Sequence, residues 1–154
     1  PSPILSVNLW LSKPVTPEAF IGLLDAQMQW VFDKPRLYEG RDQASPGHVT
    51  LVASAARDLV HREDEDLIET ALSDLKRCIP SAKDTFLKHA TVVREHQATF
   101  SLPPPLSPPP NTTDIPRLLI AGDWTDTGLP GTIESAVISG HRAADQLRTQ
   151  LQEN

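Results

Sequence analysis

The last third of the chain carries the sequence pattern that most restricts its fold. An apolar run at residues 118–121 is followed by a Gly-Asp pair, by a turn rich in glycine and proline, and by helical periodicity over residues 132–151. The apolar run predicts a buried strand, and the periodicity predicts a helix. A strand, a glycine turn and a helix in this order place unpaired backbone N–H groups at a helix N-terminus beside a strand end. Such a place suits an anionic or electron-accepting ligand.

The predicted helix is expected to bury one face that is rich in small residues. Its expected buried positions recur at three- and four-residue spacing: Ile133, Ala136, Val137, Gly140, Ala143, Ala144 and Leu147. Similar strand–turn–helix units occur in α/β proteins that bind nothing there. The pattern alone therefore leaves open whether this segment binds a ligand or only packs.

The first hundred residues are predicted to form strands and one helix. β-favouring apolar residues predict strands at residues 4–11 and 49–56, and a further strand is centred on residues 90–94. Apolar residues on one face predict a helix over residues 64–78, which Pro80 ends. These elements indicate a sheet with a helix against it.

Residues 16–33 permit two predictions. Thr16-Pro17 is a typical helix start, which predicts a helix through Gln27. Alternatively, residues 20–24 and 29–33 form a hairpin. Periodicity does not decide between the two.

A proline-rich segment at residues 101–116 is predicted to be a stiff, extended connecting loop, because proline cannot join a central strand. It would join a part at residues 1–100 to a part at residues 117–154. The alternative is a non-enzymatic binding module that presents this loop to an SH3-type domain, although no basic residue flanks the PxxP pattern.

Composition excludes several classes of protein and site. With 154 residues, 39% of them hydrophobic and 22% charged, the chain has the composition of a soluble globular protein. Its net charge of −6 and scattered basic residues argue against a nucleic-acid partner. Cys78 is the single cysteine, and the five histidines lack metal-ligand spacing, so no metal site is expected. No G-x-S-x-G elbow is present, and no catalytic residue is identified.

Four short motifs in the last third resemble the C-terminal motif of FAD-dependent phytoene-desaturase-like flavoproteins. Within this flavin amine oxidase superfamily the resemblance is greatest to the squalene-associated desaturases, or hydroxysqualene dehydroxylases. The motifs are Ala121–Thr125, Gly128–Pro130, Thr132–Glu134, and Ser139-Gly140 with Ala143-Ala144. Upstream segments, such as Gln29–Phe32, resemble the substrate domain of the same enzymes, which favours the hairpin.

The resemblance implies FAD as cofactor and assigns residues to it. The implied cofactor-binding residues are Gly122, Asp123, Trp124, Leu129, Pro130, Thr132, Ile133 and Glu134. The implied substrate-lining residues are Trp10, Trp30 and Phe32. Ser135 departs from the pattern, since many relatives have glycine there. The GxGxxG strand–turn–helix that opens these enzymes is absent, which implies the C-terminal third of a longer enzyme.

The expected fold is α+β, with an α/β arrangement at the C-terminal end. It comprises part of a sheet-based substrate domain (residues 1–100) and the closing strand–helix unit of a Rossmann-like FAD domain (residues 117–154). The implied function is an FAD-dependent oxidoreductase that exchanges hydride with a long isoprenoid, with a flavin amine oxidase as the alternative. The implied partners are the missing N-terminal part and an apolar isoprenoid. We expect a cytoplasmic protein and leave peripheral membrane contact open.

Overall fold

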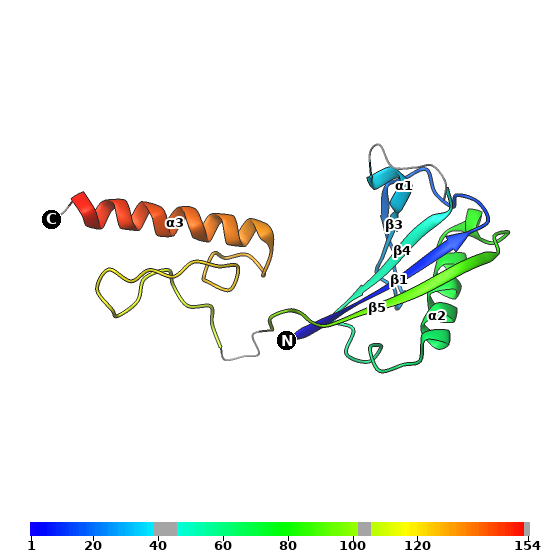
Figure 1. The fold of residues 1–154 in the computed structure, drawn as a ribbon, viewed down its shortest axis with the longest axis horizontal. Coiled ribbons are helices and arrows are strands. Elements are labelled where there is room, and N and C mark those ends of the chain that lie inside the picture. Colours follow the sequence, from blue (N-terminus) through cyan, green and yellow to red (C-terminus); the bar gives the residue numbers. More distant parts are fainter. Residues whose placement is uncertain (39–45, 102–105, 153–154) are drawn as a thin grey trace. The chain divides into compact units, whose positions relative to one another are not determined.

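The chain divides into two compact units, residues 1–98 (unit 1) and residues 99–154 (unit 2). The computed structural model describes residues 1–38, 46–101 and 106–152 (Figure 1). Residues 102–105 of the predicted proline-rich loop lie outside the described residues. No described helix is both long and apolar enough to cross a bilayer.

Unit 1 is a five-stranded sheet with a helix against one face (Figure 1). The strand order is β2-β3-β4-β1-β5, and the pairs β1–β4, β3–β4 and β2–β3 are antiparallel. Its elements are β1 (Ser2–Leu11), β2 (Phe20–Gly22), β3 (Trp30–Asp33), α1 (Lys34–Leu37), β4 (His48–Ser54), α2 (Asp64–Cys78), a 3₁₀ turn at Pro80–Ala82 and β5 (Leu87–Thr99). The strands predicted at residues 4–11, 49–56 and 90–94 and the helix predicted at 64–78 are confirmed.

The core of unit 1 lies between the sheet and α2. Alternate residues of β1 are buried, and the register pairs Leu5 with Ala53 and Val7 with Leu51 on the same face. α2 closes this face with Leu67, Ala71 and Leu75, all fully buried. Because the strand period is two, the opposite face of β1 carries more polar and aromatic residues, among them Asn8 and Trp10.

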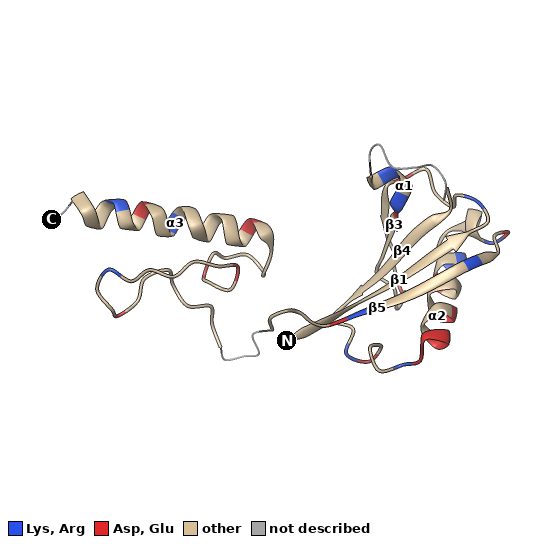
Figure 2. Ribbon diagram, viewed as in Figure 1, with Lys and Arg blue, Asp and Glu red and all other residues tan. Residues whose placement is uncertain are grey.

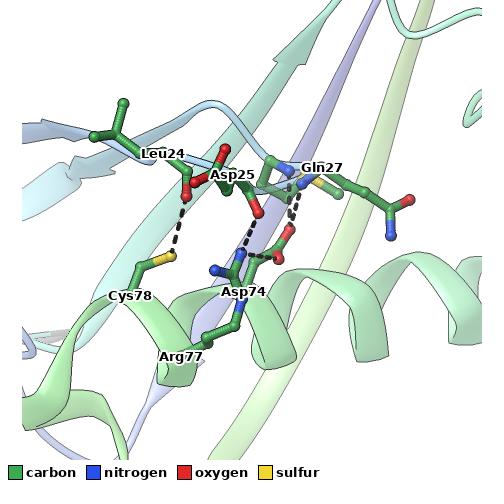
Figure 3. Close-up of polar contacts among 7 residues, drawn as sticks. Leu24, Asp25, Gln27, Asp74, Arg77 and Cys78 are labelled. Atoms are coloured by element: carbon green, nitrogen blue, oxygen red, sulfur yellow. Dashed lines mark hydrogen bonds and ion pairs between the residues drawn. The ribbon is translucent and has the colours of Figure 1, made fainter.

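Residues 20–33 form the hairpin, not the helix (Figure 3). The Asp74 carboxylate on α2 accepts hydrogen bonds from the backbone N–H groups of Gln27 (2.9 Å) and Met28 (3.0 Å), which lie in the turn between β2 and β3. Arg77 bonds both the Asp74 carboxylate (3.1 Å) and the Asp25 carbonyl (2.7 Å). A side chain 46 residues away thus satisfies the turn amides, which explains why local periodicity did not decide between the alternatives.

Replacing Asp74 by alanine is expected to destabilise unit 1 by about 3 kcal/mol, because two turn amides lose a charged acceptor in a largely buried place. Urea denaturation followed by tryptophan fluorescence measures the free energy of unfolding. Asp145→Ala removes an exposed carboxylate that pairs with the exposed Arg148, and we expect a change within about 0.5 kcal/mol. Equal losses in the two variants would contradict the anchoring role of Asp74.

Unit 2 contains one long helix, α3 (Ile133–Gln152), preceded by an irregular segment (Figure 1). The strand predicted at residues 118–121 is not formed. Only an isolated antiparallel bridge joins Thr112 to Leu119, and the Ile120 N–H donates to the Asn111 carbonyl at 2.9 Å. A strand requires a neighbouring strand, and the described part of unit 2 contains none.

The predicted buried face of α3 is also wrong for the described chain. The two fully buried residues of the helix are Ser135 and Ser139. Ile133 is 86% exposed and Val137 is 48% exposed, so the expected apolar face is not buried within the described residues. The structure is therefore a mixed α+β arrangement, in which the helix packs on its preceding segment through hydroxyl groups.

Candidate functional site

The segment before α3 ends in a helix N-terminus with unpaired amides. The Thr132 hydroxyl caps the helix by accepting from the Ser135 N–H (3.2 Å), and the Thr132 carbonyl accepts from the Ala136 N–H (3.1 Å). Within the described residues, the four backbone N–H groups of residues 131–134 donate no hydrogen bond. Unpaired N–H groups and the positive end of the helix dipole together suit an anion or an electron-rich ring.

Two glycines allow the backbone to take this path. Gly128 has φ +79°, a conformation that residues with a side chain rarely adopt. At Gly122 an added Cβ would overlap the indole ring of Trp124, so only glycine permits the close approach of that ring. The turn is consequently specific to glycine at both ends.

The residues predicted to bind the cofactor lie together in this one segment. They occupy the turn and the first residues of α3: Gly122, Asp123, Trp124, Leu129, Pro130, Thr132, Ile133 and Glu134. Trp124, Leu129 and Ile133 are exposed, and Asp123 is half-buried. The side chains of the segment thus leave its outer surface open to a ligand.

Sequence reasoning missed the buried hydroxyls that hold this segment on α3. Thr127 and Ser135 approach to 2.6 Å between their hydroxyl oxygens, and Thr125 and Ser139 do the same at 2.6 Å. The Asn111 side-chain amide donates to the Ser139 hydroxyl (2.9 Å) and to the Ile120 carbonyl (2.8 Å). The spacing Thr-x-Thr followed by Ser-x-x-x-Ser was the available signal, because serines four residues apart share one helix face.

The three predicted substrate-lining residues lie on a single face of the unit 1 sheet, opposite α2. Trp30 and Phe32 alternate with buried Val31 on β3, and their ring centroids are 6.4 Å apart. Trp10 lies on the same face of β1, since it alternates with buried Leu9 and Leu11. The structure brings Trp30 and Phe32 into contact, whereas Trp10 contacts other rings.

This face, which we call the aromatic face, includes residues that the sequence analysis did not select. Phe20 of β2 pairs with Phe32, with ring centroids 6.3 Å apart. Asn8 and Thr50 form a polar pair at the middle of the face, where the Thr50 hydroxyl donates to the Asn8 Oδ1 at 2.6 Å. Trp10 stacks on His48 of β4 at 4.1 Å between centroids. The face thus combines aromatic rings with the Asn8–Thr50 pair and the His48 imidazole.

His48 lies at the end of this face beside charged neighbours. Burial lowers the pKa of its imidazole, and Lys34 lowers this pKa further, against the opposing effect of Asp33. Its Nε2 is buried without a hydrogen-bond partner in the part of the chain that the structure describes. The folded state therefore favours neutral His48.

The free energy of unfolding is expected to fall as pH decreases through about 6.5, because the unfolded chain binds a proton at His48 before the folded chain does. His48→Gln should remove this part of the pH dependence. Denaturation at pH 7.5 and at pH 5.5 measures the difference. His96→Gln, which removes an exposed imidazole on β5, is the control. An unchanged pH dependence in His48→Gln would contradict the assignment.

Charged residues are distributed over both units (Figure 2), and the candidate cofactor segment carries Asp123, Asp126 and Glu134. Acidic residues concentrate at the start of α2 (Figure 2), where they complement the helix dipole. One of them, Asp64, pairs with Arg94 of β5 at 2.6 Å. Among the described residues no group of three His, Cys, Asp or Glu side chains is placed to hold a metal ion.

Comparison with known proteins decides the family. Residues 3–148 match the family model described as flavin containing amine oxidoreductase. The chain belongs to this family. The resemblance predicted from the C-terminal motifs is confirmed, and the family description confirms a flavin, consistent with FAD, as the cofactor.

Within this family, the chain is similar to several individual proteins. The chain is 32% identical over 145 residues to a hydroxysqualene dehydroxylase of Rhodopseudomonas palustris, covering 92% of this chain and 31% of that protein. A hydroxysqualene dehydroxylase of Sinorhizobium fredii is 30% identical with the same coverage. A probable zeta-carotene desaturase of Synechococcus elongatus is 27% identical over 71% of this chain and 23% of its own length. The chain thus spans about a third of the length of the first two.

Proposed function

We propose that the polypeptide that contains this chain is an FAD-dependent oxidoreductase acting on a long isoprenoid. The observation that carries this proposal is the set of unpaired amides at residues 131–134, in a chain of a flavin family. The relatives named hydroxysqualene dehydroxylase and zeta-carotene desaturase support an isoprenoid substrate. These two names are compatible with either hydroxysqualene or a carotene precursor as the substrate.

The residues present fit a flavin. The isoalloxazine ring gains negative charge when it is reduced, and the N-terminus of α3 offers backbone donors and a dipole of the right sign. The dipole contributes about 0.3–1 kcal/mol when exposed and more when partly buried. Upstream, Asp123 would accept hydrogen bonds from ribityl or ribose hydroxyls of the cofactor. It lies next to Gly122, where the Trp124 indole approaches the backbone closely.

Chemically, the flavin supplies hydride exchange with a substrate carbon. The contribution of this chain is to bind and orient the ring through backbone donors that need no rearrangement when charge develops. We assign no catalytic acid or base to these residues. In the strand–helix unit of the parent fold, residues 118–121 would complete a Rossmann-like sheet once neighbouring strands are supplied.

The aromatic face of unit 1 is the proposed substrate surface. Its exposed rings, Phe20 and Trp30, and the half-buried ring of Phe32 form a contiguous apolar group with centroid separations of 6.2–6.4 Å. Rings of this kind contribute large apolar contact areas to a long hydrocarbon chain. Between these rings and Trp10, the Thr50 hydroxyl donates to the Asn8 Oδ1, so its proton is already bonded where an apolar chain would cross.

The purified full polypeptide is expected to show flavin absorption bands and to convert hydroxysqualene or phytoene. We expect no turnover of a polyamine in parallel assays, because the similar proteins are named hydroxysqualene dehydroxylase and zeta-carotene desaturase. Absence of bound flavin would contradict the proposal as a whole. Turnover of the polyamine alone would replace the isoprenoid with an amine substrate and favour an amine oxidase.

We further propose that the apolar stripe of α3 packs against the rest of the same polypeptide, which the relatives indicate to be about two thirds of its length. The stripe recurs at helical spacing and consists of Ile133, Val137, Gly140, Ala144, Leu147 and Leu151. A stripe of this width is typical of a helix that faces a core. Gly140 and Ala144 would let a sheet approach closely.

Val137→Lys distinguishes a covered stripe from an exposed one. In the 154-residue chain the change is expected to alter the free energy of unfolding by less than about 0.5 kcal/mol, since the side chain is exposed. In the full polypeptide it should cost several kcal/mol, because the charge would be buried without a partner. Thr149→Lys, on the opposite side of α3, is the control in both proteins. A small effect in both proteins would contradict the proposed packing.

A further inference from the structure

We propose that the Thr127–Ser135 hydroxyl pair positions the flavin-binding amides, by fixing the turn that leads into α3. Neither hydroxyl faces the outer surface, since Ser135 is fully buried and Thr127 is 7% exposed. Both act through the backbone of the turn. The inference rests on the proposed function, because it assigns a role toward the flavin.

The directions of the hydrogen bonds follow from counting protons. The Leu129 N–H donates to the Thr127 Oγ1 (3.3 Å), and the Ser135 hydroxyl donates to the Asp123 carbonyl (3.2 Å). Each hydroxyl has one proton. The proton in the 2.6 Å contact between Thr127 and Ser135 therefore belongs to Thr127. A single chain of donors thus runs from Leu129 through Thr127 and Ser135 to Asp123.

A second pair one helical turn later holds the other end of the segment. The Gly122 N–H donates to the Ser139 Oγ (3.0 Å), and the Thr125 hydroxyl donates to the Gly122 carbonyl (2.8 Å). By the same count, Ser139 donates its proton to Thr125 across 2.6 Å. The two hydroxyls thus connect the N–H and the carbonyl of one glycine. Serines four residues apart on α3 clamp the segment at two levels.

The backbone groups at the ends of these relays belong to residues assigned to the cofactor. Asp123 and Leu129 are bound by the first pair, and Gly122 by the second. Arg142 of α3 adds a bond to the Asp126 carbonyl at 2.9 Å. The amides of residues 131–134, in contrast, make no internal hydrogen bond within the described segment. Their placement depends on the clamped turn on one side and the helix on the other.

Fixed donors bind a ligand more strongly than mobile ones, because no ordering cost is incurred on binding. Removing the Ser135 hydroxyl leaves the Thr127 proton and the Asp123 carbonyl without this bond, and removing the Thr127 hydroxyl leaves the Leu129 N–H without its acceptor. Either change frees the turn. The effect on the flavin should be indirect but measurable. Thr127 and Ser135 are accordingly positioning residues.

The test uses the full polypeptide, stripped of flavin and titrated with FAD. Thr127→Val and Ser135→Ala are each expected to raise the FAD dissociation constant roughly tenfold. The double variant should raise the FAD dissociation constant no further than the single variant with the larger effect, because both substitutions break the same relay. Thr127→Ser keeps the hydroxyl and should retain the affinity of the unmodified protein.

The control for a purely structural effect is Thr85→Val in unit 1. Thr85 is 5% exposed, and its hydroxyl donates to the Ala82 carbonyl at 2.7 Å, so the change removes an equally buried bond remote in sequence. It is expected to lower the melting temperature without changing the FAD dissociation constant. A second readout is the midpoint potential of the bound flavin, which should become more negative in the relay variants, since displaced amides stabilise the reduced anion less.

The inference is overturned if both relay variants melt lower while FAD affinity and midpoint potential match those of Thr85→Val. If Thr127→Val does not fold, Ser135→Ala and Thr127→Ser decide by the same two measurements. A full polypeptide that binds no flavin before any substitution overturns the proposed function instead, so the two failures are distinguishable.

Discussion

The geometry of unit 2 depends on the contact between α3 and the segment before it, and that contact is made by buried hydroxyls. Ser135 and Ser139 occupy the helix face where an apolar side chain would be the ordinary choice. A buried hydroxyl is stable only with its hydrogen bonds made, and each of these reaches a threonine in the turn. Directional bonds define the path of the backbone more closely than apolar contact does. They therefore also fix the positions of the backbone amides at the start of α3.

Unit 1 shows a corresponding division between its two faces. One face of the sheet is closed by α2 and carries the apolar core, while the other carries aromatic rings, the Asn8–Thr50 pair and His48. The hairpin that contributes Phe20, Trp30 and Phe32 to the aromatic face is anchored from behind by Asp74. The core side of the sheet thereby determines where the rings of the other side lie. In both units, residues remote from the proposed ligand position those that face it.

Much of this arrangement was predictable because it is local. The β-favouring apolar residues at 4–11 predict a strand, and the helical spacing of apolar residues at 64–78 predicts a helix. Each pattern is a property of a single segment, and both predictions are confirmed. The motif spacing at residues 121–144 identified the family. The choice between a hairpin and a helix at residues 16–33 could not be made from local sequence, because the carboxylate that decides it, Asp74, lies far away in sequence.

The two wrong predictions concern elements whose partners are not among the described residues. A strand at residues 118–121 needs neighbouring strands, and a buried apolar stripe on α3 needs a surface to cover it. Periodicity identifies an apolar face without identifying what packs on it. The serine face was missed for a different reason: Thr-x-Thr and Ser-x-x-x-Ser are visible in the sequence, but their pattern does not distinguish buried hydroxyls from exposed ones.

Hydrogen exchange of the full polypeptide, with and without FAD, tests the central claim most directly. The account predicts that FAD slows exchange of the backbone amides at residues 131–134, which have no internal partner. It also predicts that the Gly122 and Leu129 amides, already bonded to Ser139 and Thr127, change less. Equal exchange at residues 131–134 with and without bound FAD would contradict the assignment of the flavin to the start of α3.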